Sequence, residues 1–81
     1  MSLVWITKAS YLRDYQIEIE FNNNKKGIVD FKNHLEKKIF EPLKEIDNFK
    51  KFKINSWTIE WENGADFSPE FLLENLDFHS A

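Results

Sequence analysis

The chain of 81 residues is long enough for one domain with a single hydrophobic core and too short for two. Its aromatic share of 16% is high, and since large rings bury much apolar area, a stable small core is expected. The chain has no cysteine, which excludes disulfides, thiolate nucleophiles and sulfur ligands for metals, and it has no apolar stretch long enough to cross a membrane.

The formal net charge of −3 is distributed unevenly. Residues 25–53 carry nine lysines and five acidic groups, whereas residues 54–81 carry six acidic groups and neither lysine nor arginine. The favoured interpretation is that the two segments face each other or are solvated. The alternative is two surfaces of opposite sign, one for a polyanion and one for a basic partner. With no cysteine and no targeting segment, we expect a cytoplasmic protein that does not bind membranes.

Three strands are expected in the first third of the chain. Residues 3–9 are rich in β-branched and aromatic side chains and are apolar on both faces, as in a central strand or at an interface. Residues 11–15 are expected to turn, and residues 15–21 then alternate apolar and polar side chains, which predicts a half-buried strand. The asparagines at 22–24 tolerate left-handed backbone angles and connect this strand to one at 26–31, so the segment predicts an antiparallel meander.

Short helices are expected to follow the meander and to pack on one face of the sheet. A first helix is predicted by apolar residues at intervals of four, namely Phe31, Leu35 and Ile39. Pro42 is expected to end it or to force a new start, because proline cannot donate the backbone hydrogen bond of a helix. A second short helix, capped by Asp47, is predicted by apolar residues at intervals of three, namely Leu43, Ile46, Phe49 and Phe52.

Residues 57–70 are expected to form a strand, a tight turn and the start of a helix. The alternation of side chains places Trp57, Ile59 and Trp61 together on the core face of the strand. Asn63 and Gly64 tolerate positive φ angles, so they are expected to turn the chain.

The final helix has a clear start in the sequence. Ser68 is expected to cap it by accepting a hydrogen bond from a free amide, with Pro69 at the first helical position. The apolar side of this helix is formed by Phe71, Leu72 and Leu76. Residues 77–81 are expected to fray.

Few residues of the chain carry catalytic chemistry. The two glycines form no phosphate-binding loop, and His34 and His79 lack partners at the spacing of a helical metal pair. No serine lies in a nucleophile motif. We therefore expect no catalytic site, no cofactor and no metal site. We would consider an enzyme only if Asp30, Asp66 or His34 were found to line one pocket.

Two pairs of carboxylates occupy the polar faces of predicted strands: Glu18 with Glu20, and Glu60 with Glu62. If these two strands are neighbours, the outer surface of the sheet is acidic. The favoured interpretation is a solvated face that Lys8 and Lys26 neutralise, and the alternative is a docking surface for a protein partner.

Aromatic and cationic side chains are interleaved in the segment Phe49-Lys50-Lys51-Phe52-Lys53, as they are in proteins that bind single-stranded nucleic acid. The interval of three between Phe49 and Phe52 instead fits the apolar side of the predicted helix, which leaves only the lysines exposed. Together with the acidic net charge, this favours a protein partner, and nucleic acid is kept as the alternative.

The residues around the expected turn also resemble a known family. The pattern consists of Gly27-x-Val29-Asp30, Phe40-x-Pro42-Leu43 and Ile59-x-Trp61-x-Asn63-Gly64-Ala65-Asp66-x-x-Pro69-Glu70-x-Leu72. From residue 4 to residue 73 the chain resembles the bacterial family known as domain of unknown function 2442. The resemblance implies an α+β fold with an antiparallel sheet and helices, and it implies no established biochemical activity.

The resemblance also implies two kinds of relatives: N-terminal domains joined to a helix-turn-helix, and small proteins encoded beside a second small family in what resembles a toxin and antitoxin arrangement. This chain departs from the family pattern at Asn23-Asn24, where an acidic-Gly turn is common, at Glu62, where Pro is frequent, and at Leu73, where Tyr is frequent. Since the 81 residues leave no room for a helix-turn-helix, we do not expect this chain to regulate transcription alone.

The sequence thus predicts a single α+β domain over residues 1–81, with an antiparallel β-meander, short helices on one face and a capped C-terminal helix. Our leading hypothesis is a non-catalytic module that binds another protein, as an antitoxin-like or regulatory accessory protein. A homodimer is also expected, because the strand that contains Trp5 is apolar on both faces. Candidate partner contacts are Asp66, Glu60, Glu62, Glu18, Glu20, Lys50, Lys51 and Lys53. The motif residues Trp61, Asn63, Gly64, Ser68 and Pro69 are expected to be structural, whereas the role of Asp66 stays open.

Overall fold

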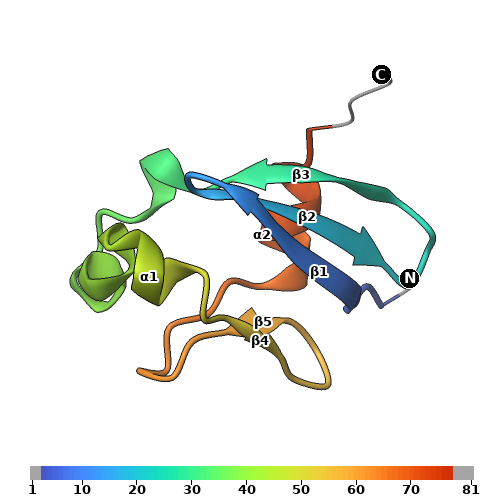
Figure 1. Ribbon diagram of the computed structural model, residues 1–81. Coiled ribbons are helices and arrows are strands. Elements are labelled where there is room, and N and C mark those ends of the chain that lie inside the picture. The colour runs from blue at the N-terminus through green and yellow to red at the C-terminus, as the bar shows by residue number, and fades with distance from the viewer. Residues whose placement is uncertain (1–2, 78–81) are drawn as a thin grey trace.

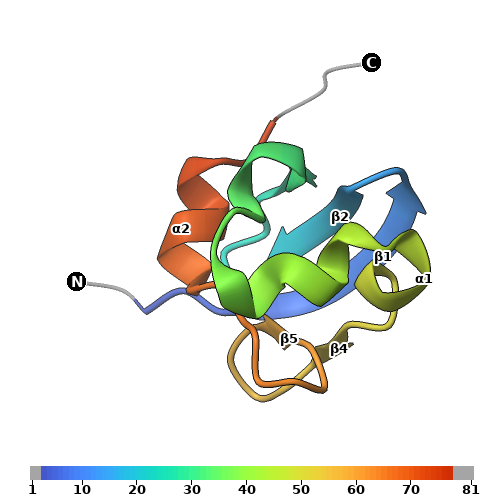
Figure 2. The same ribbon diagram turned by 90° about the vertical axis from the view of Figure 1, so that its left-hand side faces the viewer.

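The computed structural model describes residues 3–77 and has an α+β fold (Figure 1). The elements in chain order are β1 (Ile6–Arg13), β2 (Gln16–Phe21), β3 (Lys26–Asp30), the 3-10 helices η1 (Lys32–His34) and η2 (Lys38–Lys44), α1 (Ile46–Phe49), β4 (Lys53–Ile54), β5 (Ile59–Glu60) and α2 (Pro69–Glu74). β1, β2 and β3 form one sheet, and β4 and β5 form a second. The helices and the β4–β5 hairpin gather on one side of the larger sheet, as Figure 2 shows from a second direction. The predicted fold class is confirmed.

The three-stranded sheet is the predicted antiparallel meander, with β2 in the centre. In β2 the side chains alternate as predicted: Ile17 and Ile19 are buried, whereas the polar residues between them are half-exposed. Ile19 pairs with Ala9 of β1 and with Gly27 of β3. The connection between β2 and β3 contains Asn24 with a φ of +69°, a left-handed angle that asparagine tolerates.

β1 lies later in the chain than the sequence predicts. It continues to Arg13, so the turn expected over 11–15 is confined to Asp14 and Tyr15. Asp14 carries the turn with a φ of +48°. Tyr11 stays in the strand, where its ring packs on Phe49 of α1 with ring centroids 6.2 Å apart. The contact with α1, which is distant in the sequence, therefore accompanies a strand that is longer than its own residues predict.

The helix predicted over 31–39 is wrong. The short 3-10 helices η1 and η2 replace it, and Ile39 is 47% exposed while Phe40 is buried in its place. A 3-10 helix has three residues per turn, so Phe40 and Leu43 lie on the same side of η2, and both are buried. Pro42 lies inside η2, so it neither ends this helix nor starts a new one.

The apolar residues predicted to share one side are buried or half-buried, but α1 contains only two of them, Ile46 and Phe49. Leu43 belongs to η2, and Phe52 follows α1. Asp47 does not cap this helix as predicted, because the helix already begins at Ile46 and the capping position falls on Glu45, whose side chain forms no cap. The Asp47 carboxylate instead lies 3.7 Å from the Lys50 ammonium.

Aromatic rings fill the core beneath the sheet. Phe31, Phe49 and Trp61 contact one another, with ring centroids 5.6, 5.8 and 6.3 Å apart. The indole N–H of Trp61 donates to the carbonyl oxygen of Phe49 at 2.7 Å, so the buried indole keeps a hydrogen-bond partner. Phe67, from the segment before α2, packs on Phe31 at 4.9 Å and on Trp61 at 6.0 Å. These rings join the sheet, α1 and the C-terminal segment into one core.

Backbone contacts partly cover both edges of the larger sheet. At the β1 edge, the N–H of Ile6 donates to the carbonyl oxygen of Trp57 at 3.1 Å. At the β3 edge, Ile28 and Asp77 exchange two hydrogen bonds of 3.1 and 2.8 Å. The prediction of a frayed tail is therefore wrong at Asp77, and residues 78–81 lie outside the described part of the chain.

Candidate functional site

The turn after β5 has the geometry that the sequence predicts. Gly64 has a φ of +90°, and its N–H donates to the carbonyl oxygen of Trp61 at 2.9 Å. The Asn63 side chain makes two bonds: Oδ1 accepts from the N–H of Ala65 at 3.1 Å, and Nδ2 donates to the carbonyl oxygen of Ile39 at 2.8 Å. Asn63 therefore ties the turn to η2, which is a structural task.

Ser68 caps α2 as predicted. Its Oγ accepts from the N–H of Phe71 at 3.1 Å, and Pro69 is the first helical residue. Asp66, two residues earlier, is held through its backbone by a β-bridge to Glu60, while its side chain is exposed. The cap thus leaves the Asp66 carboxylate free for other contacts.

Trp57 does not belong to the core, contrary to the prediction. β5 contains only Ile59–Glu60, and ahead of it Asn55 closes a turn in which its Oδ1 accepts from the N–H groups of Trp57 and Thr58, both at 2.7 Å. This turn points Thr58 inward, where its hydroxyl donates to the carbonyl oxygen of Phe67 at 2.7 Å. Trp57 is left 41% exposed.

Trp57 instead stacks on Trp5 at the surface. The two ring centroids are 6.3 Å apart with 23° between the planes, and Trp5 is 38% exposed. Asn22 holds the segment before β1, because its Oδ1 accepts from the N–H of Trp5 at 2.9 Å and its Nδ2 donates to the carbonyl oxygen of Leu3 at 3.1 Å. We call the stacked pair of Trp5 and Trp57 the tryptophan patch.

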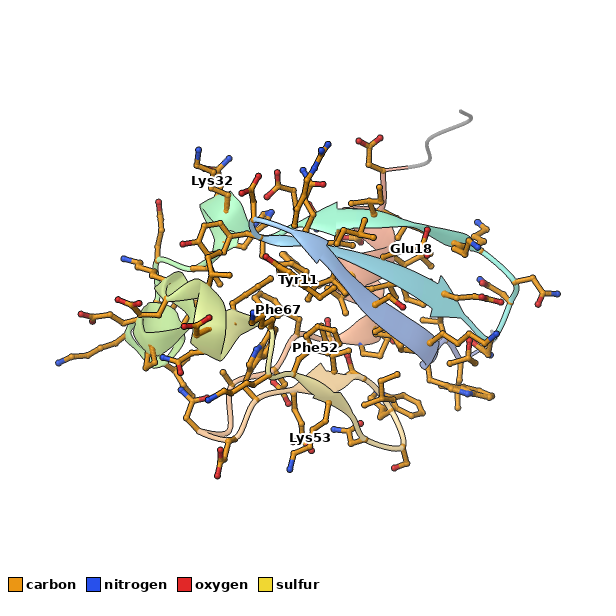
Figure 3. All side chains as sticks on the ribbon, in the orientation of Figure 1. Tyr11, Glu18, Lys32, Phe52, Lys53 and Phe67 are labelled. Atoms are coloured by element: carbon orange, nitrogen blue, oxygen red, sulfur yellow. The ribbon has the colours of Figure 1, made fainter. Side chains whose placement is uncertain are left out.

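The lysine segment 50–53 presents cations without exposed stacking rings. Phe49 is fully buried and Phe52 is half-buried against the core, whereas Lys53 points away from the body of the molecule (Figure 3). Each end of the segment has an acidic neighbour: Lys50 contacts Asp47, and Lys53 faces Glu60 across the β4–β5 hairpin. Lys51 is exposed as well.

The two glutamate pairs, Glu18 with Glu20 and Glu60 with Glu62, do not share a surface. The first pair lies on the outer face of β2, where Figure 3 labels Glu18, and the second lies in β5 and in the turn that follows it, outside the larger sheet. Lys8 of β1 and Lys26 of β3 are the cross-strand partners of Glu20. Charges of both signs therefore lie side by side on this outer face, and the condition for a single acidic surface, that the two strands are neighbours, is not met.

A groove of about 390 Å³ lies between the 3-10 helices and the segment that leads into α2. Phe67 and Phe71 stack along it with ring centroids 5.4 Å apart, and His34 stands perpendicular to Phe71 at 5.1 Å. We call this hollow the phenylalanine groove. Asp66 lines it as well, so two of the three residues of the enzyme hypothesis meet in one place. The third, Asp30, lines a separate cavity of about 260 Å³ together with His34.

Within residues 3–77, no three His, Asp or Glu side chains are arranged to hold a metal ion. In the same part of the chain, no helix has both the length and the apolar character needed to cross a membrane. His79 lies outside the described residues.

The family model described as protein of unknown function (DUF2442) matches residues 6–77 of the chain. No curated protein and no solved structure matches significantly. The match includes every strand and helix of the described fold, together with the turn at Gly64. As the resemblance of that turn predicts, the chain belongs to this family of unknown function.

Proposed function

We propose that this protein is a non-catalytic module that binds another protein, and that the tryptophan patch is its main contact surface. The observation that carries the proposal is the stacked pair of Trp5 and Trp57, which are 38% and 41% exposed, whereas the third tryptophan, Trp61, is 3% exposed. A soluble fold gains nothing in stability from the exposed part of a large apolar ring, so the exposed area is available to a partner.

The two indoles are suited to binding because they are already ordered. Tryptophan is enriched among the residues that dominate protein interfaces, since its large ring fills a pocket on the partner. The side chain of Asn22 fixes the backbone at Trp5, and the side chain of Asn55 fixes it at Trp57. Stacking further restricts both rings, so little conformational entropy is lost on binding.

The phenylalanine groove supports a binding role more than a catalytic one. An acid–base pair works when one group holds the other in orientation through a hydrogen bond. His34 and Asp66 line the same groove, but within residues 3–77 neither side chain forms a hydrogen bond. The arrangement supports the proposed binding role, whereas a catalytic role would require the two side chains to come within hydrogen-bond distance in a complex.

A protein partner accounts for the surface better than nucleic acid does. The rings that would stack on bases, Phe49 and Phe52, are buried and half-buried, and acidic groups accompany Lys50 and Lys53. We infer that the protein has an antitoxin-like or regulatory accessory role, in which it binds and holds one partner. The family resemblance supports this role, and the lack of cysteine supports a location in the cytoplasm.

The test begins with purification of the tagged protein from its natural host and mass spectrometry of the proteins that co-elute. We expect one stoichiometric partner, whose Kd is then measured with purified components. Trp57→Ser is expected to raise Kd at least about tenfold, because removing a central tryptophan commonly costs more than 1.4 kcal/mol. The matched control is Leu12→Ser, since Leu12 is 43% exposed and lies near the other end of β1.

Equal effects of the two variants would contradict the assignment of the contact surface. Failure to recover any stoichiometric protein would count against the proposal as a whole. Recovery of nucleic acid, released by raised salt and weakened by loss of Lys50 and Lys51, would support the alternative. If the partner is a second copy of this chain, sedimentation gives a dimer that Trp57→Ser converts to a monomer.

A further inference from the structure

We infer that the phenylalanine groove binds the guanidinium group of an arginine presented by a partner polypeptide. The groove lies on residues outside the tryptophan patch, so the inference goes beyond the proposed function.

The size and shape of the groove suit one or two side chains. Its volume of about 390 Å³ is at the small end of the range for ligand sites. Phe40, Phe67 and Phe71 form a row of nearly parallel rings along it, with centroids 4.7 and 5.4 Å apart and interplanar angles of 4° and 19°. His34 closes the row by packing perpendicular to Phe71. Phe40 and Phe67 are each 8% exposed and cover one another's faces, whereas Phe71 is half-buried. Phe71 is therefore the ring of this row that has the most surface open to a ligand.

Asp66 presents a carboxylate to this wall without using it elsewhere. The β-bridge to Glu60 fixes its backbone, and within residues 3–77 its side chain forms no hydrogen bond and no ion pair. The Ser68 hydroxyl next to it is already occupied by the helix cap. A fixed backbone with a free carboxylate is the arrangement that accepts hydrogen bonds from a ligand at low cost in entropy.

The charge around the groove favours a cation. Asp66 and Glu36 line it with a single lysine, Lys37. Glu70 adds a further carboxylate in the first turn of α2. The 3-10 helices on the opposite wall carry Lys32, Lys38 and Lys44 outside the lining. The lining itself has a net charge of −1, with its carboxylate at Asp66 on the wall that has no lysine or arginine, so a basic side chain is favoured at Asp66.

Among basic side chains, arginine fits both the aromatic ring of Phe71 and the free carboxylate of Asp66. Its guanidinium is planar and stacks on aromatic rings, and its fork of N–H groups bonds both oxygens of one carboxylate. A lysine ammonium is a more strongly hydrated point charge and uses neither feature as well. The expected contact is a guanidinium that lies against Phe71 and donates to Asp66.

The test uses a synthetic peptide and needs no natural partner, so its outcome is independent of the tryptophan patch. The ¹⁵N-labelled protein is titrated with acetyl-Leu-Arg-Leu-amide and, separately, with the same peptide carrying citrulline, which has the shape of arginine without its charge. We expect the amide signals of His34, Asp66 and Phe71 to shift with the arginine peptide. The citrulline peptide is expected to bind about two- to fivefold more weakly, which is the factor an exposed ion pair contributes.

Asp66→Asn is expected to remove this preference for arginine, while Asp47→Asn, which deletes an equal charge on α1 outside the groove, keeps it. Since both changes are at exposed positions, the backbone spectrum verifies that each variant is folded. Equal affinity for arginine and citrulline would overturn the inference, and so would signal shifts confined to other surfaces or no shifts at all. Inorganic phosphate that moves the same signals more strongly than the arginine peptide would show an anion site and overturn it as well.

Discussion

Gly64 is the residue on which the turn between β5 and α2 depends. Its φ of +90° lies in a region that other L-residues rarely adopt, and no heavy atom lies within 4 Å of the place where a Cβ would stand. The need for glycine is therefore set by the backbone angle and not by crowding.

Gly64→Ala is expected to lower the free energy of unfolding by about 1–2 kcal/mol, the cost of holding a Cβ in the left-handed region. Gly64→Asn serves as the control, because asparagine tolerates such angles better and should cost less. Urea denaturation of the three proteins gives both differences. A loss for Ala that is no larger than the loss for Asn would contradict this account of the turn.

Backbone preference and side-chain alternation predict the role of a single residue correctly only where no side-chain hydrogen bond competes with the regular backbone structure. Asn63, Gly64 and Ser68 have the roles expected from their own chemistry. Trp57 was expected to be buried with Ile59 because apolar and polar residues alternate there. The side chain of Asn55 instead bonds to the following backbone and competes with strand pairing, which reverses the faces at Trp57. The periodic pattern contains no sign of that competition.

At the scale of elements, the boundaries that failed are those decided by contacts between distant segments. Apolar residues at 31–39 fit intervals of four, yet Phe40 is buried because it stacks on Phe67, whose ring lies 4.7 Å away. Similarly, the segment around Asp77 is ordered against β3: a Cβ on Gly27 would lie 2.8 Å from the Asp77 carbonyl oxygen, so this approach requires glycine. β2 was predicted correctly because its alternation alone determines which face is buried.

The start of α2 gives a prediction for an element. Ser68→Ala is expected to lower the free energy of unfolding by about 1 kcal/mol, since the N–H of Phe71 loses its cap. Ser10→Ala is the matched control, because Ser10 is exposed on β1 and caps no helix. Thermal or urea unfolding gives the comparison. A Ser10 variant destabilised as much as the Ser68 variant would argue against capping as the cause.

For the molecule as a whole, the meander, the C-terminal helix and the turn motif were predictable, but the form of the helices between residues 31 and 44 and the two candidate surfaces were not. Trp5 and Trp57 stand far apart in sequence and meet only because the loop before β5 bonds to the start of β1. His34 and Asp66 likewise meet across the phenylalanine groove. Sequence spacing carries no information about such pairs until the core has been assembled.

The central claim is that a partner protein covers the tryptophan patch. It is tested most directly by ¹⁹F NMR of protein labelled with 5-fluorotryptophan, with each signal assigned by a single Trp→Phe substitution. In the free protein, the signals of Trp5 and Trp57 are expected to shift between H₂O and D₂O, whereas buried Trp61 should not respond. Saturation with the partner should abolish the response of Trp5 and Trp57. If both signals keep their full solvent response in the saturated complex, the partner binds elsewhere and the claim is contradicted.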